Sequence, residues 1–153
     1  YCAATGHVDY AVCGPLYVGC ATWTLLYDTL YAHQDKSDDA KLGLQSSALT
    51  LGDAGTPPFL RACGLATVSG VSLAGHNAGL SLADPCFGAA VAAFAAHLAW
   101  QVETADLGDP HNLATRFKSN AYVAPVLLAG IAAAKLGLPP DVAAAAAASA
   151  AAA

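Results

Sequence analysis

Long apolar stretches alternate with polar segments along this chain of 153 residues. Four stretches carry no Asp, Glu, Lys or Arg, and they cover residues 10–27, 62–83, 85–102 and 119–134. A helix needs about 20 predominantly apolar residues to cross the hydrocarbon core of a bilayer, and about 17 to 25 are tolerated. The pattern therefore predicts an all-α integral membrane fold with about four transmembrane helices.

The composition supports this interpretation, because 56% of the residues are apolar and only 11% are charged. In soluble domains about a quarter of the residues are charged. The formal net charge is -5, with only six basic residues. We therefore expect no nucleic-acid partner, since such binding depends on clustered Lys and Arg. The chain begins at Tyr1 and contains no methionine, so we expect it to be part of a longer protein.

Two polar connections, residues 31–58 and 103–120, separate the first helix from the second and the third from the fourth. If the helices alternate in direction, both connections lie on the same side of the membrane. Most of the basic residues fall in or next to them: Lys36, Lys41, Arg61, Arg116 and Lys118. Basic connections face the cytoplasm, or the matrix in a mitochondrion, so the sequence predicts this orientation for the polar side.

The segment DTLYAHQDKSDDAKLG, residues 28–43, concentrates acid directly after an uncharged helix. If that helix continues beyond the membrane surface, its Asp side chains and one Tyr share a single stripe: Asp28, Tyr31, Asp35, Asp38 and Asp39. Their mutual repulsion would be offset by Mg²⁺, which binds one or two carboxylates, several waters and phosphate oxygens. The alternative is a solvated acidic loop whose charges pair with Lys36 and Lys41.

The run YDTLYAHQDKSDDAKLGLQSSAL, residues 27–49, resembles the second aspartate-rich motif of the UbiA superfamily of intramembrane prenyltransferases. It is most similar to the 4-hydroxybenzoate polyprenyltransferases of ubiquinone biosynthesis. PLYVGCATWTLLYD resembles the helix that leads into this motif, and AAHLAWQV and FKSN resemble the family's third connection. The resemblance implies that residues 1–138 form the C-terminal part of a nine-helix UbiA-type bundle. The alanine-rich tail, residues 139–153, lies outside it.

The reaction implied by this resemblance transfers a polyprenyl group from an allylic polyprenyl diphosphate to 4-hydroxybenzoate. Mg²⁺ assists by neutralising charge on the departing pyrophosphate. By motif position, Asp35 and Asp39 are the expected catalytic carboxylates, and the expected metal ligands are Asp35, Asp39, Asp38 and Asp28. The expected substrate-binding residues are Tyr31, Lys36, Lys41 and Ser46. The family's first aspartate motif is absent from these residues, so we expect the chain to be inactive alone.

The resemblance also implies partners and a location. Besides the two substrates, the expected partners are the lipid bilayer and a complex of ubiquinone biosynthesis. The expected location is the mitochondrial inner membrane, as a multi-pass protein whose acidic motif faces the matrix. The alternative location is a bacterial plasma membrane, with the motif facing the cytoplasm. Two other functions stay open: a UbiA-type transferase for another acceptor (homogentisate, naphthoate or haem), and a non-catalytic Mg²⁺-binding membrane subunit or transporter.

Overall fold

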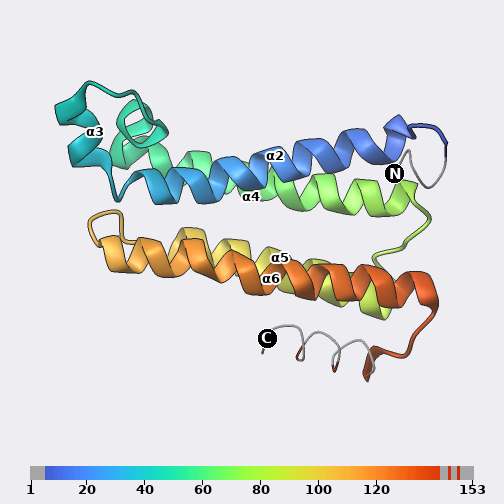
Figure 1. Ribbon diagram of the computed structural model, residues 1–153. Coiled ribbons are helices and arrows are strands. Elements are labelled where there is room, and N and C mark those ends of the chain that lie inside the picture. The colour runs from blue at the N-terminus through green and yellow to red at the C-terminus, as the bar shows by residue number, and fades with distance from the viewer. Residues whose placement is uncertain (1–5, 142–144, 146–147, 149–153) are drawn as a thin grey trace.

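A computed structural model describes residues 6–141, 145 and 148 of the chain, and within these residues the regular secondary structure is helical. The helices are α2 (Tyr10–Ala32), α3 (Lys36–Leu42), α4 (Ser47–Asn77), α5 (Pro85–Glu103) and α6 (Pro110–Leu136). Figure 1 shows two pairs of long helices, α2 beside α4 and α5 beside α6, with the short α3 at one end. The two pairs also touch, because α4 contacts α5 and α2 contacts α6.

Local signals in the sequence place the helix ends. The side chains of Asp9, Asp84 and Asp109 each accept a backbone hydrogen bond at the start of α2, α5 and α6, respectively. A proline follows directly at the first turn of α5 and α6, where its missing N–H costs nothing. At the other end of α6, Gly137 adopts φ 63°, a left-handed conformation that suits glycine at a helix end.

Glycines let the helices approach closely. A Cβ atom on Gly70 of α4 would lie 2.6 Å from the Pro15 carbonyl oxygen and 2.9 Å from the Gly19 backbone of α2. A Cβ on Gly130 of α6 would collide with the Ala90 side chain of α5. Such small-residue contacts are typical of helix pairs inside membranes. The largest buried side chains around them include Phe87, Phe94, Leu26, Leu30, Leu60 and Leu98.

All four apolar stretches are helical over most of their length, as predicted. Of the described helices, α5 and α6 are long and apolar enough to cross a membrane. The second predicted stretch ends early, because α4 stops at Asn77 and Gly79 follows with φ 82°.

The two polar connections are shorter than predicted. Residues 31–58 contain the end of α2, the whole of α3 and the start of α4. The predicted connection over residues 103–120 reduces to residues 104–109, because Asp109 and Pro110 start α6 well before Ser119. The FKSN segment and the basic residues Arg116 and Lys118 therefore lie on a helix.

The two polar connections lie at the same end of the molecule, as expected for helices that alternate in direction. Figure 1 shows α3 and the connection between α5 and α6 at the same end of the molecule, and the connection between α4 and α5 at the other. We call the end that holds α3 and the connection between α5 and α6 the polar end; it comprises residues 33–56 and 104–109. Lys135 lies at the opposite end, where its ammonium donates a hydrogen bond to the Ala78 carbonyl.

Candidate functional site

The aspartate-rich segment bends where a straight helix was predicted. Helix α2 ends at Ala32 and α3 begins only at Lys36. The prediction of one continuous acidic stripe is therefore wrong. His33 follows the last residue of α2 and its side chain is buried against Thr56 of α4, so the chain turns toward α4. The turn leaves Asp28 and Tyr31 on α2, and separates them from the remaining aspartates.

Asp35 and Asp39 stay one helical turn apart on the bent segment. Asp35 occupies the N-cap position of α3, and its backbone carbonyl accepts from the amides of Asp38 and Asp39, both at 2.9 Å. Residues four apart on a helix are neighbours on its surface. Within the described residues, the carboxylates of Asp28, Asp35 and Asp39 have no hydrogen-bond or ion-pair partner, so their oxygens are free to accept other ligands.

The two predicted phosphate-binding lysines are both paired with carboxylates. Lys41 Nζ lies 2.8 Å from Asp38 Oδ1 on the surface of α3, so the internal pairing considered from the sequence is present here. Lys36 Nζ lies 2.6 Å from Oδ1 of Asp53, an exposed residue of α4. A diphosphate would compete with these carboxylates for each ammonium group.

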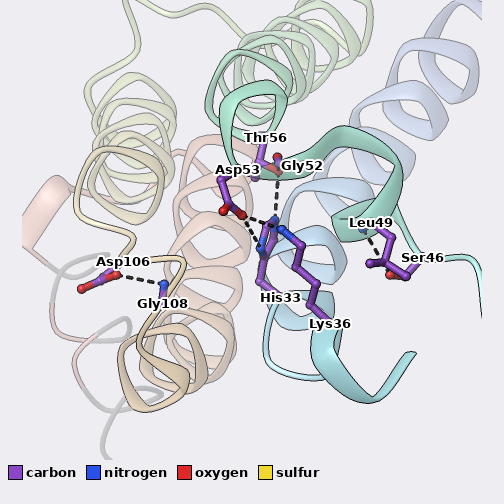
Figure 2. A network of polar contacts seen from close by, with 9 residues as sticks. All are labelled: His33, Lys36, Ser46, Leu49, Gly52, Asp53, Thr56, Asp106 and Gly108. Carbon is purple, nitrogen blue, oxygen red and sulfur yellow. Dashed lines mark hydrogen bonds and ion pairs between the residues drawn. The ribbon is translucent and has the colours of Figure 1, made fainter. Parts of the chain in front are cut away.

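Figure 2 shows His33, Lys36, Asp53 and Thr56 side by side at the polar end. His33 Nε2 lies 2.9 Å from Thr56 Oγ1, and His33 Nδ1 lies 3.8 Å from Asp53 Oδ1. Burial lowers the pKa of His33, with a further contribution from the charge of Lys36, while Asp53 opposes the change. The hydrogen bond from Lys36 lowers the pKa of Asp53. Both effects favour neutral His33 beside an ionised Lys36 and Asp53 pair.

Ser46 has a structural role in the described geometry. Its side chain caps the start of α4 by accepting a hydrogen bond from Leu49 N at 3.4 Å. Figure 2 also shows Asp106, which closes a turn in the connection between α5 and α6 by accepting from Gly108 N at 2.9 Å. The sequence did not predict that Asp53 and Thr56 contact Lys36 and His33. The only feature that pointed to them was their position shortly after the aspartate-rich segment.

A cavity of about 790 Å³ lies between α2 and α6. Most of its wall is aromatic or apolar, and its lining includes Trp23, Tyr27, Phe117, Lys118, Asn120 and Tyr122. Trp23 Nε1 donates to Asn120 Oδ1 at 2.9 Å and so ties the two helices together. The ring of Tyr31 lies 5.0 Å from that of Phe117, which connects this predicted substrate residue to the cavity wall. Three of the FKSN residues line this cavity, although the motif was assigned to a connection.

The described residues contain no group of three or more His, Cys, Asp or Glu side chains that could hold a metal ion. Mg²⁺ does not require such a group, because it is held by one or two protein carboxylates together with waters and phosphate oxygens. The unpartnered carboxylates of Asp35 and Asp39 fit that partial ligand set. The remaining ligands would come from the diphosphate and from water.

Comparisons with known proteins identify the same family that the aspartate-rich motif resembles. The model of the UbiA prenyltransferase family matches residues 1–126. The mitochondrial 4-hydroxybenzoate polyprenyltransferase of Mus musculus is 46% identical over 129 residues, which are 84% of this chain and 33% of the mouse protein. The relative of the same name in Homo sapiens is 41% identical over 84% of this chain and 34% of its own length. The relative of the same name in Arabidopsis thaliana is 37% identical over 84% of this chain and 31% of its own length.

The chain thus spans about a third of the length of these curated relatives. No solved structure matches the chain significantly. The family match covers most of the chain and includes the whole aspartate-rich segment, the turn at His33 and the first residues of α4. The chain belongs to the UbiA prenyltransferase family.

Proposed function

We propose that residues 1–138 form the C-terminal part of an integral-membrane enzyme that transfers a polyprenyl group to 4-hydroxybenzoate. The donor is an allylic polyprenyl diphosphate, and the bond forms at the ring carbon next to the hydroxyl group. The observation that carries the proposal is the pair of unpartnered carboxylates, Asp35 and Asp39, in a family segment next to an apolar cavity. The similar mitochondrial proteins are named for this activity.

Asp35 and Asp39 would hold Mg²⁺, with Asp38 on α3 and Asp28 near the end of α2 as further candidate carboxylates. When bound, the ion supplies Lewis-acid neutralisation of the charge that develops on pyrophosphate as the allylic C–O bond breaks. This break is the hard step, because it creates an allylic cation.

The lysines, Tyr31 and Ser46 complete the proposed diphosphate site. Lys36 and Lys41 contact phosphate oxygens after exchanging their present carboxylate partners, and Tyr31 lies at the junction with the cavity. Ser46 contributes at the start of α4, where the residue is half-buried.

The cavity between α2 and α6 suits the apolar part of the substrate. Trp23, Tyr27 and Phe117 form much of its wall, and their rings contact one another or neighbouring rings edge to face. In the reacting enzyme an apolar wall would limit the access of water, which would otherwise capture the allylic cation before the aromatic acceptor does.

We further propose that α2, α4, α5 and α6 all cross the membrane, within a nine-helix bundle. The polar end would face the matrix of a mitochondrion from its inner membrane, consistent with the mitochondrial relatives, or the cytoplasm in a bacterium. A complex of ubiquinone biosynthesis is a further proposed partner. The tail over residues 139–153 lies outside the enzyme domain, and most of it falls outside the described residues.

The test is Asp35→Asn in the full-length protein in native membranes, supplied with Mg²⁺, geranyl diphosphate and 4-hydroxybenzoate. We expect loss of pyrophosphate release with unchanged membrane insertion, because the amide is a far weaker magnesium ligand than the carboxylate. Asp141→Asn is the matched control, since Asp141 is exposed beyond the end of α6. Near-normal turnover in Asp35→Asn would remove Asp35 from the metal site.

The acceptor is tested in the same membranes. Prenylation of homogentisate, naphthoate or haem instead of 4-hydroxybenzoate would support a UbiA-type transferase with another acceptor. Absence of pyrophosphate release with every acceptor would favour the non-catalytic Mg²⁺-binding subunit or transporter. Transport is the weaker alternative, because the aspartates cluster at one end of the helices and not midway along them.

A further inference from the structure

Helix α3 carries the aspartates but is not held by apolar packing. None of its residues, Lys36–Leu42, is buried. Its neighbour in the bundle is α4, and the side-chain attachments near it are polar. The side-chain contacts that attach this segment to α4 are therefore the hydrogen bond of His33 with Thr56 and the ion pair of Lys36 with Asp53.

His33 makes the most buried of these attachments. Its side chain has no exposed surface, and its Nε2 lies 2.9 Å from Thr56 Oγ1, which is itself fully buried. The hydroxyl of Thr56 has one hydrogen, which it donates to the Gly52 carbonyl at 2.7 Å. Thr56 must therefore accept from His33, and His33 carries its proton on Nε2. This hydrogen count fixes the tautomer of the ring and its orientation.

The other ring nitrogen is left as an acceptor. His33 Nδ1 is buried and has no hydrogen-bond partner among the described residues. The charged groups that face it are Asp53 on α4 and Lys36 on α3. Lys36 Nζ and Asp53 Oδ1 lie 2.6 Å apart, so a second contact, beside that of His33, ties this segment to α4. Figure 2 shows these three side chains converging from the two segments.

The partner of His33 is located at a break in α4. Gly52 adopts φ 64° and ψ -179°, a conformation that disfavours any residue with a Cβ atom, and it interrupts the helix between residues 47–51 and the remainder. The hydrogen bond from Thr56 to the Gly52 carbonyl closes the first helical turn after this break. His33, which lies two residues before Asp35 in the sequence, thus bonds to a hydroxyl in the first turn of α4 after the break.

We propose that His33 is a positioning residue, which holds the turn at residues 33–35 on Thr56 and so places Asp35 and Asp39 to bind a magnesium diphosphate. The inference rests on the proposed function, and it assigns the positioning of the proposed metal ligands to the hydrogen bond between His33 and Thr56. A turn held in place loses less conformational freedom when the ligand binds, so the attachment raises affinity for the metal and diphosphate. It has no direct effect on the aromatic acceptor.

The test compares Thr56→Val, which keeps the branched shape but removes the acceptor, with Thr56→Ser, which keeps the hydroxyl. Binding of Mn²⁺ in the presence of inorganic pyrophosphate is measured by electron paramagnetic resonance on the purified full-length protein. We expect Thr56→Val to weaken Mn²⁺ binding by roughly 3- to 10-fold, as for the loss of one buried hydrogen bond. Thr56→Ser should restore binding.

Steady-state kinetics supply a second readout. Thr56→Val should raise KM for geranyl diphosphate and leave KM for 4-hydroxybenzoate unchanged, whereas a general loss of folding would affect both. His33→Gln, whose amide can still donate to Thr56, should retain more Mn²⁺ binding than His33→Ala. Unchanged Mn²⁺ binding in Thr56→Val, or equal effects on both KM values, would overturn the inference.

These outcomes separate the inference from the proposed function. If the unmodified protein releases no pyrophosphate with any acceptor, the proposed function fails. The Mn²⁺ comparison of Thr56→Val with Thr56→Ser still tests whether the hydroxyl positions the metal-binding turn, because it does not require turnover.

Discussion

The middle of the bundle and its polar end are held together by different means. In the middle, α2 and α4 approach until the backbones of Gly19 and Gly70 are in contact. At the polar end, α3 buries none of its residues and is attached through His33 and Lys36. The first region depends on shape, and the second depends on a small number of polar groups.

Because of this difference, we expect the middle of the bundle to determine stability and the polar end to determine the geometry of the candidate site. Steric packing between helices decides whether the bundle forms, and a single added methyl group is felt there. The ion pair of Lys36 with the exposed Asp53 contributes little to folding. In our proposal, this pair and the buried hydrogen bond of His33 position the carboxylates. Substitutions in the two regions should therefore affect different measurements.

The largest effect is expected for Gly70→Ala in the middle of the bundle. Its Cβ would lie 2.6 Å from the Pro15 carbonyl oxygen, so α2 and α4 must separate at a cost of about 1 to 3 kcal/mol. Gly64→Ala on the same helix is the matched control, because its nearest neighbour is Leu26 Cδ1 at 3.6 Å, an ordinary contact. Unfolding by sodium dodecyl sulfate in detergent micelles measures both. Equal stability of the two variants would contradict close packing at Gly70.

A smaller effect is expected where α2 meets α6. The hydrogen bond from Trp23 to Asn120 should show a coupling free energy of about 1 kcal/mol in a double-mutant cycle of Trp23→Phe and Asn120→Ala. Trp100→Phe combined with Asn120→Ala is the control, since no hydrogen bond joins this pair in the described structure. Coupling of the same size in the control cycle would show that the effect is not specific to the Trp23 hydrogen bond.

The smallest effect on stability is expected at the polar end. Lys36→Gln removes the ion pair with Asp53, so the amides of α3 should exchange hydrogen faster, by less than about fivefold. Lys41→Gln is the control, because Lys41 pairs with Asp38 within α3 and does not attach it to α4. Hydrogen exchange followed by mass spectrometry should show unchanged protection of α5 and α6 in both variants. Faster exchange throughout the bundle would mean that Lys36 supports the whole fold.

Much of the fold could be predicted from local features of the sequence. Uncharged stretches of helical length predicted α2, α4, α5 and α6, and caps such as Asp84 with Pro85 account for where two of them begin. The run from Tyr27 to Leu49 carries enough of a motif to identify the family from its residues alone. These properties depend on residues that are close together in the sequence, so they can be recognised without knowledge of the tertiary structure.

The bend at His33 could not be predicted in this way. It depends on a hydrogen bond to Thr56, 23 residues further on, and on the pairing of Lys36 with Asp53, 17 residues further on. Helix periodicity carries no information about such contacts, so it favoured one straight acidic helix. Ser46, by contrast, carries a local signal that sequence reasoning did not use, because serine is a preferred N-cap residue and here it caps α4.

By itself, the sequence determined that this chain forms apolar helices and carries the aspartates of a UbiA prenyltransferase. Only the tertiary structure decided how those aspartates are presented, because the packing of α2 against α4 brings Thr56 and Asp53 to the turn. The physical reason is that helix formation follows from local composition, whereas the direction of a polar turn is set by the partners that folding brings to it.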